Sequence, residues 1–310
     1  MRRRPSFARA PVSRNARRHK SLADTNDAAT PRPPRQMRLV SLCATCIVRY
    51  SVIQTSDDDV RASDDFGKET LVAILAVAAS KGGSGKTTLC LLLADAFARV
   101  GMPVAILDAD PQASSLQWMR RCEAARDKPG LITVEAAVGE IALSEKLDGA
   151  GEYGVVIVDL PGVLNQVVGV GASRADLVIV PMRMSFHDVT EAVKLLKWLE
   201  AVVGHTGPVN ARIVANDVDA IAQRTAAFRE AARFAVQHNL PFFNTVLRSR
   251  NVFKAMAHQS GSLSTVPADP DQLEKAKRNV GDLMSEILRM FPGQDGEAAA
   301  ADAERQKVGA

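Results

Sequence analysis

Short apolar runs alternate along this chain with longer segments whose apolar residues recur every three or four positions. The run from Leu71 to Ala79 reads Leu-Val-Ala-Ile-Leu-Ala-Val-Ala-Ala. It lacks polar alternation, which is typical of a strand buried on both faces of a sheet. The next segment carries apolar residues at helical spacing, namely Leu89, Leu92, Leu93, Ala96, Phe97 and Val100. The pattern therefore predicts a strand followed by a helix.

The same alternation continues to residue 290. We predict strands over 71–79, 103–108, 131–135, 154–159, 176–181, 209–215 and 241–246. We predict helices over 86–100, 113–125, 137–147, 163–172, 188–203, 221–238, 250–259 and 270–290. Such strands joined by helices indicate an α/β fold with a doubly wound, mostly parallel sheet and helices on both faces. Ligands bind such sheets at the carboxyl ends of the strands.

Residues 1–70 depart from this pattern. The first 20 residues carry eight Arg or Lys and no acid, and we expect the whole segment to be a basic, disordered extension. Three interpretations stay open: an arm that binds DNA through its charge, a segment of transit-peptide composition, or a start codon assigned upstream of Leu71 or Val72. We expect a folded domain over 71–291 and a flexible tail over 292–310.

Composition limits the class of protein. Of the 310 residues 46% are hydrophobic, which is enough for a substantial core. No apolar run reaches the roughly 18 residues of a membrane-spanning helix. Four cysteines in a chain this long do not indicate a disulfide framework. Cys43 and Cys46 form a lone C-x-x-C, for which a metal or redox role is weighed against free thiols in a loose segment.

A glycine-rich loop directly follows the first predicted strand. It reads Lys81-Gly-Gly-Ser-Gly-Lys-Thr-Thr, with Ser80 in place of the first glycine of the G-x-x-x-x-G-K-[ST] pattern. Glycines let backbone N–H groups turn inward around an anion, and the following helix presents its positive N-terminus to the same anion. We predict a nucleotide-phosphate site made by Gly82, Gly83, Ser84, Gly85, Lys86, Thr87 and Thr88.

Within this loop, two side chains have specific predicted roles. Lys86 would bridge the β- and γ-phosphates, and the Thr87 hydroxyl would ligate Mg²⁺. Asp159 ends the apolar run Val155-Val-Ile-Val, where its carboxylate can hold Mg²⁺ through water opposite Thr87; a strand-end cap is the alternative. Asp108 and Asp110 leave another strand at the same edge, in an Asp-x-Asp-Pro sequence that by itself more often marks a turn.

Three segments together resemble one family. Lys81 with Gly-Gly-Ser-Gly-Lys-Thr-Thr is similar to the deviant Walker A box of the ParA/MinD ATPases. Val104 to Gln112 (Val-Ala-Ile-Leu-Asp-Ala-Asp-Pro-Gln) resembles the second box of that family, and Val155 to Gly162 resembles its Walker B strand. The resemblance spans roughly 71–291, and three boxes in the right order make it specific to the family.

The resemblance implies a slow, partner-stimulated ATPase that uses ATP and Mg²⁺. It implies that Asp110 positions or activates the attacking water and that Asp108 supports the Mg²⁺ shell. It also implies that Lys81 reaches the partner's nucleotide across an ATP-bound homodimer, so that hydrolysis depends on dimerisation as with an arginine finger. Asn216 resembles the family's adenine-contacting asparagine, although a plain loop asparagine fits the sequence equally well.

Motifs that this sequence lacks disfavour some branches of the family. The apolar stripe of the helix near Asp271 to Phe291 is typical of core packing, and the tail after it has no apolar face, which disfavours MinD-type membrane targeting. No cysteine follows Walker B as in nitrogenase-type iron proteins, and the tyrosine-rich tail of the related bacterial kinases is missing. The remaining resemblance is to ParA-type DNA partition proteins, which are cytoplasmic and associated with the nucleoid.

That branch implies non-specific DNA binding by the ATP dimer and a ParB-like or relaxosome partner protein. Candidate DNA contacts are basic residues of the C-terminal half: Lys194, Lys197, Arg224, Arg229, Arg233, Arg248, Arg250, Lys254, Lys275, Lys277 and Arg278.

Two alternatives use the same chemistry. Segments 114–121 and 246–256 look similar to VirC-like accessory ATPases of conjugative or T-DNA transfer. A positioning ATPase for a non-DNA cargo would also bind nucleoid DNA, so its cargo would distinguish it.

Overall fold

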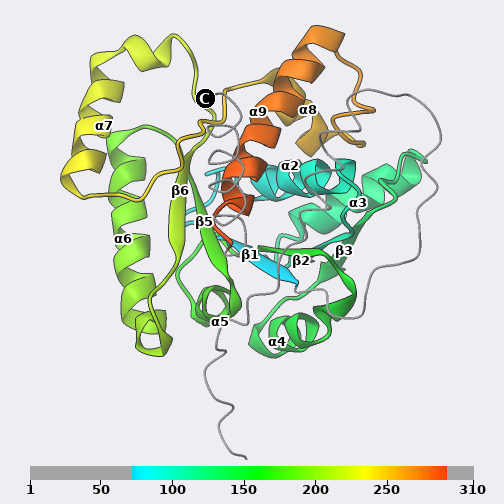
Figure 1. Cartoon of the computed structure of the whole chain (residues 1–310), viewed down its shortest axis with the longest axis horizontal. Coiled ribbons are helices and arrows are strands. Elements are labelled where there is room, and N and C mark those ends of the chain that lie inside the picture. Colours follow the sequence, from blue (N-terminus) through cyan, green and yellow to red (C-terminus); the bar gives the residue numbers. More distant parts are fainter. Residues whose placement is uncertain (1–71, 292–310) are drawn as a thin grey trace, which may run out of the picture. The chain divides into compact units, whose positions relative to one another are not determined.

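A computed structural model of the protein describes residues 72–291 (Figure 1). The predicted extension over 1–70, the tail over 292–310 and the Cys43/Cys46 pair lie outside the described residues.

The described residues form one sheet of six parallel strands in the order β3-β2-β4-β1-β5-β6. This confirms the predicted parallel α/β architecture. The strands are β1 (Ala73–Val77), β2 (Val104–Asp108), β3 (Ile132–Ala136), β4 (Val155–Asp159), β5 (Leu177–Met182) and β6 (Ala211–Ala215).

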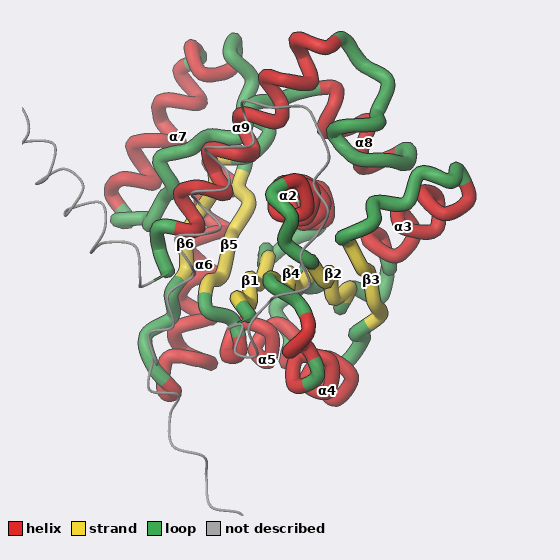
Figure 2. The backbone as a smooth tube through the Cα atoms, turned by 45° about the vertical axis from the view of Figure 1, so that its right-hand side comes forward, coloured by secondary structure: helices red, strands yellow, loops and turns green. Residues whose placement is uncertain are grey.

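Helices connect the strands and cover both faces of the sheet (Figures 1 and 2). The α-helices are α2 (Lys86–Arg99), α3 (Ser114–Ala124), α4 (Glu140–Asp148), α5 (Gln166–Arg174), α6 (Phe186–Val203), α7 (Ala226–Gln237), α8 (Asn251–His258) and α9 (Pro270–Leu288). The short 3-10 helices are η1 (Ala150–Glu152), η2 (Gly204–Thr206) and η3 (Ala222–Arg224).

The central strand β1 shows why its sequence is apolar throughout. Leu75 and Val77 belong to a core cluster with α2, α3, α8 and α9, whereas Ile74, Ala76 and Ala78 belong to the opposite cluster with α4, α5, α6 and α7. Alternate side chains of a strand point to opposite faces, so a strand covered on both sides has no polar position. Burial of both clusters holds the strand ends at one edge, where the predicted motifs lie.

The predicted strand over 241–246 is wrong. This segment makes a single isolated bridge, Ile213 with Phe242, beside β6. The N–H of Ile213 donates to the carbonyl of Pro241, and the N–H of Phe243 returns a bond to Ile213. The ladder stops there because the N–H groups of Asn244 and Thr245 donate to the Glu286 carboxylate of α9 and not to β6.

Local capping explains the helix boundaries that differ from prediction. The helix expected over 137–147 begins at Glu140, because Gly139 ends the extended entry with a φ of 94°. The one expected over 163–172 begins at Gln166, where the Asn165 side chain accepts the N–H of Val168.

The helix expected over 221–238 is broken in two. The Asp219 carboxylate accepts two backbone N–H groups at the start of η3, and Thr225 then caps α7. These side-chain bonds to the backbone favour a turn followed by a new helix start over one continuous helix.

Helix α9 packs on α2 through a buried stripe of Ala276, Val280, Leu283, Met284 and Ile287. This confirms the core-packing interpretation of its apolar face. In the part of the chain that the structure describes, no helix combines the length and apolarity needed to cross a bilayer.

Candidate functional site

The glycine-rich loop joins the end of β1 to the start of α2 (Figure 1). Gly83 and Gly85 have φ values of 75° and 92°, in the left-handed region that favours glycine. Gly85 is the N-cap of α2, and its carbonyl accepts the N–H of Leu89 at 2.9 Å. The first turn of α2 therefore presents N–H groups and the positive end of its dipole to the loop.

Lys86 and Thr87 begin α2 directly behind this loop. Lys86 is 7% exposed, so its ammonium group is held inside the site. The Thr87 hydroxyl donates to Oδ2 of Asp159 at 2.8 Å. A Cβ built on Gly162, in the loop after β4, would lie 3.0 Å from Nζ of Lys86 and from the backbone N of Gly82. The loop after β4 therefore packs directly against the glycine-rich loop and its lysine.

Two carboxylates stand side by side at the ends of β2 and β4. Asp108 and Asp159 are register partners, and both are fully buried. Burial and the charge of Asp108 raise the pKa of Asp159 to about 6, against the opposing effect of the hydroxyls that donate to it. Burial likewise raises the pKa of Asp108, although backbone N–H groups donate to it. Such a pair is favourable in its ionised form when positive charge lies beside it.

Two buried polar atoms of this site have no hydrogen-bond partner among the described residues: Oγ of Ser84 in the loop and Oδ1 of Asp159. Leaving such atoms unpaired costs about 1–3 kcal/mol each, so buried polar atoms of this kind are expected to meet a ligand. The Ser84 hydroxyl can donate to a phosphate oxygen. Oδ1 of Asp159 and the Thr87 hydroxyl oxygen are hard oxygen donors of the kind that Mg²⁺ binds. The donor set therefore fits a magnesium nucleotide.

Asp110 follows Asp108 at the tip of β2. Its backbone N–H donates to Oδ1 of Asp108 at 3.3 Å, and its own Oδ1 accepts the N–H of Gln112 at 2.9 Å. These bonds fold a turn that keeps both carboxylates at the same edge as the glycine-rich loop. The roles assigned to Asp108 and Asp110 in Mg²⁺ support and water activation stay predictions.

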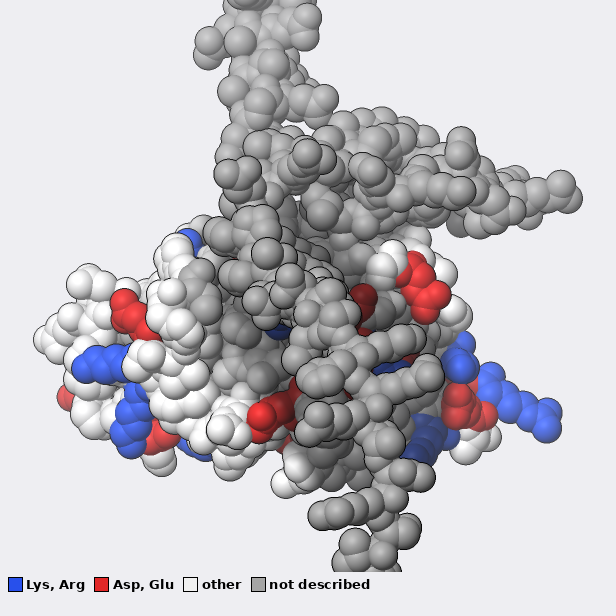
Figure 3. Space-filling view, turned by 90° about the horizontal axis from the view of Figure 1, so that it is seen from below, with Lys and Arg blue, Asp and Glu red and all other residues white. Residues whose placement is uncertain are grey.

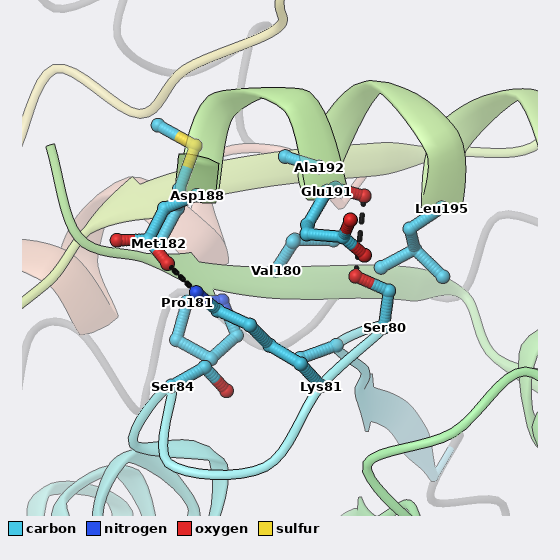
Figure 4. A pocket seen from close by; sticks show the side chains of 11 residues that line it. Ser80, Lys81, Ser84, Val180, Pro181, Met182, Asp188, Glu191, Ala192 and Leu195 are labelled. Carbon is cyan, nitrogen blue, oxygen red and sulfur yellow. Dashed lines mark hydrogen bonds and ion pairs between the residues drawn. The ribbon is translucent and has the colours of Figure 1, made fainter. Parts of the chain in front are cut away.

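Lys81, at the front of the loop, forms an ion pair with Asp188 in the first turn of α6 (Figure 4). The pair lines a pocket between the loop, the end of β5 and α6, and Oγ of Ser80 donates to the carbonyl of Glu191 on the opposite wall at 3.2 Å. Lys81 is therefore held within its own chain. Its predicted action across a dimer requires this ion pair to open.

Asn216 lies at the end of β6 against the glycine-rich loop. Its Nδ2 donates to the carbonyl of Ser84 at 3.0 Å, and its Oδ1 accepts the N–H of Asp217 at 2.9 Å. The Asn216 side chain therefore connects the end of β6 to the glycine-rich loop. Its predicted contact with adenine stays a prediction.

Sequence reasoning missed two residues that contact these side chains. Ser115 in α3 donates to Oδ2 of Asp159 at 2.9 Å, and Asp188 holds Lys81. Asp188 had a local signal, because Ser185-x-x-Asp188 is a capping pattern in which Ser185 accepts the N–H of Asp188. The sequence signal for Ser115 was weaker: its hydroxyl lies in the first turn of a helix, and that helix follows a strand end rich in Asp.

The basic residues predicted to contact DNA are distributed over several elements. They lie on η3, α6, α7, α8, α9 and the loop before α8. Three of them contact carboxylates, in the pairs Lys194–Glu191, Lys254–Asp217 and Lys277–Glu274. On the face shown in Figure 3, Lys and Arg side chains likewise stand among Asp and Glu. The DNA contacts assigned to these residues stay predictions.

The glycine-rich loop, the buried lysine and the Thr87–Asp159 pair at the carboxyl edge of a parallel sheet define a P-loop nucleotide-binding protein. The family described as "CobQ/CobB/MinD/ParA nucleotide binding domain" matches residues 75–263. The chain belongs to this family, which confirms the resemblance seen in the sequence.

Individual relatives agree with this assignment. "Protein ParA" of Rhizobium radiobacter is 28% identical over 207 residues, which cover 66% of this chain and 91% of the relative. "Maintenance of carboxysome distribution protein A" of Gloeobacter kilaueensis is 29% identical over 191 residues, which cover 61% of this chain and 83% of the relative.

Among solved structures, cobyrinic acid a,c-diamide synthase of Mycobacterium smegmatis, with a bound ATP analogue and magnesium, matches with a TM-score of 0.56 at 20% identity. The match covers 73% of this chain and 97% of that chain. At this identity the likeness shows the fold.

Proposed function

We propose that this protein is a Mg²⁺-dependent ATPase of the ParA type, which dimerises on ATP, binds DNA without sequence preference and drives DNA partition. The observation that carries the proposal is the loop with two lysines: Lys86 is buried beside Asp159, and Lys81 stands at the front edge. The likeness to a ParA protein over 91% of that relative supports the partition branch.

The residues of the site fit phosphoryl transfer to water, which needs positioning and charge neutralisation more than covalent chemistry. The loop N–H groups and Lys86 would hold the β- and γ-phosphates. Thr87 and Asp159, with support from Asp108, would hold Mg²⁺, which when bound neutralises charge on the phosphate oxygens. Asp110 would orient the attacking water. Lys81 of a second copy would supply further positive charge, which makes hydrolysis depend on the dimer.

DNA binding is the part of the cycle that an experiment can test directly. The full chain is titrated into fluorescently labelled duplex DNA with ATP or with ADP, at low and at raised salt. We expect tight binding with ATP, weak binding with ADP, and a steep loss of affinity with salt because phosphate contacts release counterions.

The matched control is Lys86→Ala, which removes the phosphate-binding ammonium group and should bind DNA equally weakly with either nucleotide. Equal affinity of the unaltered chain with ATP and ADP would contradict the proposed cycle.

Two alternatives keep the same site chemistry and differ in cargo. The likeness to a carboxysome distribution protein favours a positioning ATPase for a non-DNA cargo. The resemblance of 114–121 and 246–256 to VirC-like proteins favours an accessory role in DNA transfer. Adjacent genes separate the three: a ParB-like gene supports partition, a relaxase gene supports transfer, and a gene for a large assembly supports positioning.

A further inference from the structure

One turn of helix α3 contacts both buried carboxylates of the site. The backbone N–H of Leu116 donates to Oδ2 of Asp108 at 3.0 Å, and the Ser115 hydroxyl donates to Oδ2 of Asp159 at 2.9 Å. Ser115 is fully buried, and the bond joins residues 44 apart in sequence. The start of α3 is therefore built into the candidate Mg²⁺ site, although none of the three family boxes includes Ser115.

The two oxygens of Asp159 are in different surroundings. Oδ2 accepts from two hydroxyls, Thr87 at 2.8 Å and Ser115 at 2.9 Å, whereas Oδ1 is buried and has no partner among the described residues. A carboxylate oxygen has about two lone-pair sites, so the two hydroxyls occupy Oδ2 fully. This leaves Oδ1 as the oxygen available to a ligand.

From this arrangement we propose that Ser115 is a positioning residue of the Mg²⁺ site, which orients the Asp159 carboxylate so that Oδ1 faces the cation. With Thr87 alone, the carboxylate could rotate about its Cβ–Cγ bond and exchange its oxygens. A second donor from α3, on a different element, removes that freedom. Outer hydrogen bonds of this kind orient ligands and strengthen metal binding.

The backbone before α3 supports this role. Ala113, the N-cap of α3, has a φ of 52°, a left-handed conformation that is uncommon for a residue with a Cβ. The Asp110 carbonyl accepts the Ala113 N–H at 2.8 Å and closes the turn. This turn aims the first residues of α3 back at the carboxylates. Strained backbone of this sort persists where the surrounding structure requires it, often beside functional sites.

The test separates Mg²⁺ from nucleotide. ADP binding to the full chain is measured by titration calorimetry in EDTA and then with increasing MgCl₂. Ser115→Ala should leave ADP affinity in EDTA unchanged, because the P-loop contacts remain. Adding Mg²⁺ should increase ADP affinity in both proteins, but Ser115→Ala should need about tenfold more Mg²⁺ to reach half of that increase. Tenfold is about the lower end of the losses in metal affinity seen when an outer-shell partner is removed. Ser115→Thr, which keeps the hydroxyl, should restore much of that loss.

The matched control is Ser285→Ala, which removes an exposed hydroxyl that donates to the carbonyl of Gly281 within α9 and should change neither measurement. If the ADP affinity of Ser115→Ala depended on Mg²⁺ as it does in the wild type, the inference would be overturned. An equal loss of ADP affinity with and without Mg²⁺ would also overturn it, since the role would then be structural.

The inference rests on the proposed nucleotide site, and the same titration tells the two apart. A wild-type chain that binds no ADP in either buffer overturns the proposed function together with the role of Ser115. A wild-type chain with a normal Mg²⁺ response, matched by Ser115→Ala, overturns the role of Ser115 alone.

Discussion

At the scale of single residues, Asp159 shows how this site combines function with a cost in stability. Its carboxylate is fully buried beside Asp108, and burial raises its pKa to about 6. The folded, ligand-free chain therefore holds a proton on Asp159 at a pH where the unfolded chain has released it. The contribution of Asp159 to the free energy of unfolding is therefore largest below about pH 4 and is lost as the pH rises through about 6.

We predict that Asp159→Asn stabilises the ligand-free protein near pH 7 by on the order of 3 kcal/mol, because the amide cannot ionise. Urea unfolding in EDTA across a pH series would measure this. The difference in free energy of unfolding between variant and wild type should grow from about pH 4 to about pH 6 and then level off. A difference that is constant across the series would contradict the shifted pKa. The variant should also lose the Mg²⁺ dependence of ADP binding.

Lys81 illustrates the difference between a contact within one chain and a role in a dimer. Its ammonium group pairs with Asp188 of the same chain, whereas Lys86 is buried under the loop. We predict that Lys81→Ala binds ATP about as tightly as wild type and loses most ATP turnover, because its charge is needed on the partner's nucleotide.

Nucleotide affinity and steady-state phosphate release, measured on the same preparation, test this prediction. Lys128→Ala is the control, since it removes an exposed lysine that pairs with Glu123. Normal turnover in Lys81→Ala would show that the second lysine has no part in catalysis.

At the scale of elements, the site depends on loops that pack on one another. A Cβ on Gly162 would meet the backbone of Gly82 and Lys81 at 3.0 and 3.1 Å, and backbone atoms cannot move aside as a flexible side chain would. By contrast, a Cβ on Gly151 would have open space around it. The loop after β4 therefore sets the position of the glycine-rich loop that follows β1.

We predict that Gly162→Ala weakens ADP binding at least tenfold and destabilises the protein by about 1–3 kcal/mol, because overpacking pushes the two loops apart. Gly151→Ala should stay near wild type in both respects. Calorimetric titration and urea unfolding of the two variants measure the contrast. Unchanged ADP affinity in Gly162→Ala would mean that the two loops move independently.

At the scale of the whole molecule, the proposed cycle depends on keeping dimer formation separate from hydrolysis. Asp110 lies in the turn after β2, where its carboxylate caps the N–H of Gln112 and leaves the Thr87–Asp159 contact intact. Removing its side chain should spare nucleotide binding while the attacking water loses its orientation.

We predict that Asp110→Ala forms a dimer with ATP that persists for hours and stays on DNA, whereas the wild-type dimer dissociates as ATP is consumed. Light scattering after gel filtration would follow the mass, and release of labelled DNA would follow the complex. Lys86→Ala serves as the control that should remain monomeric. Rapid dissociation of the Asp110→Ala dimer with ATP still present would contradict the role of Asp110 in turnover.

The sequence by itself determined the class of fold and the chemistry of the loop. An unbroken apolar run such as Val155 to Val158 is enough to predict a buried strand, because a strand covered on both faces has few positions for polar side chains. Gly83, Gly85, Lys86 and Thr87 lie within five consecutive positions, so their geometry follows from local backbone preferences. The strand expected over 241–246 is wrong because the N–H groups of Asn244 and Thr245 bond to Glu286, a residue far along the chain that no local pattern reveals.

Tertiary structure decided everything that joins distant segments. The pairing of Asp108 with Asp159, the hydroxyl of Ser115 on Oδ2 of Asp159, and the ion pair of Lys81 with Asp188 each connect residues more than 40 positions apart. No periodicity along the chain encodes such contacts, because they depend on strand order and on the direction in which each helix leaves the sheet. The sequence named the groups that can hold a magnesium nucleotide, and packing of the sheet and helices brought them to one edge.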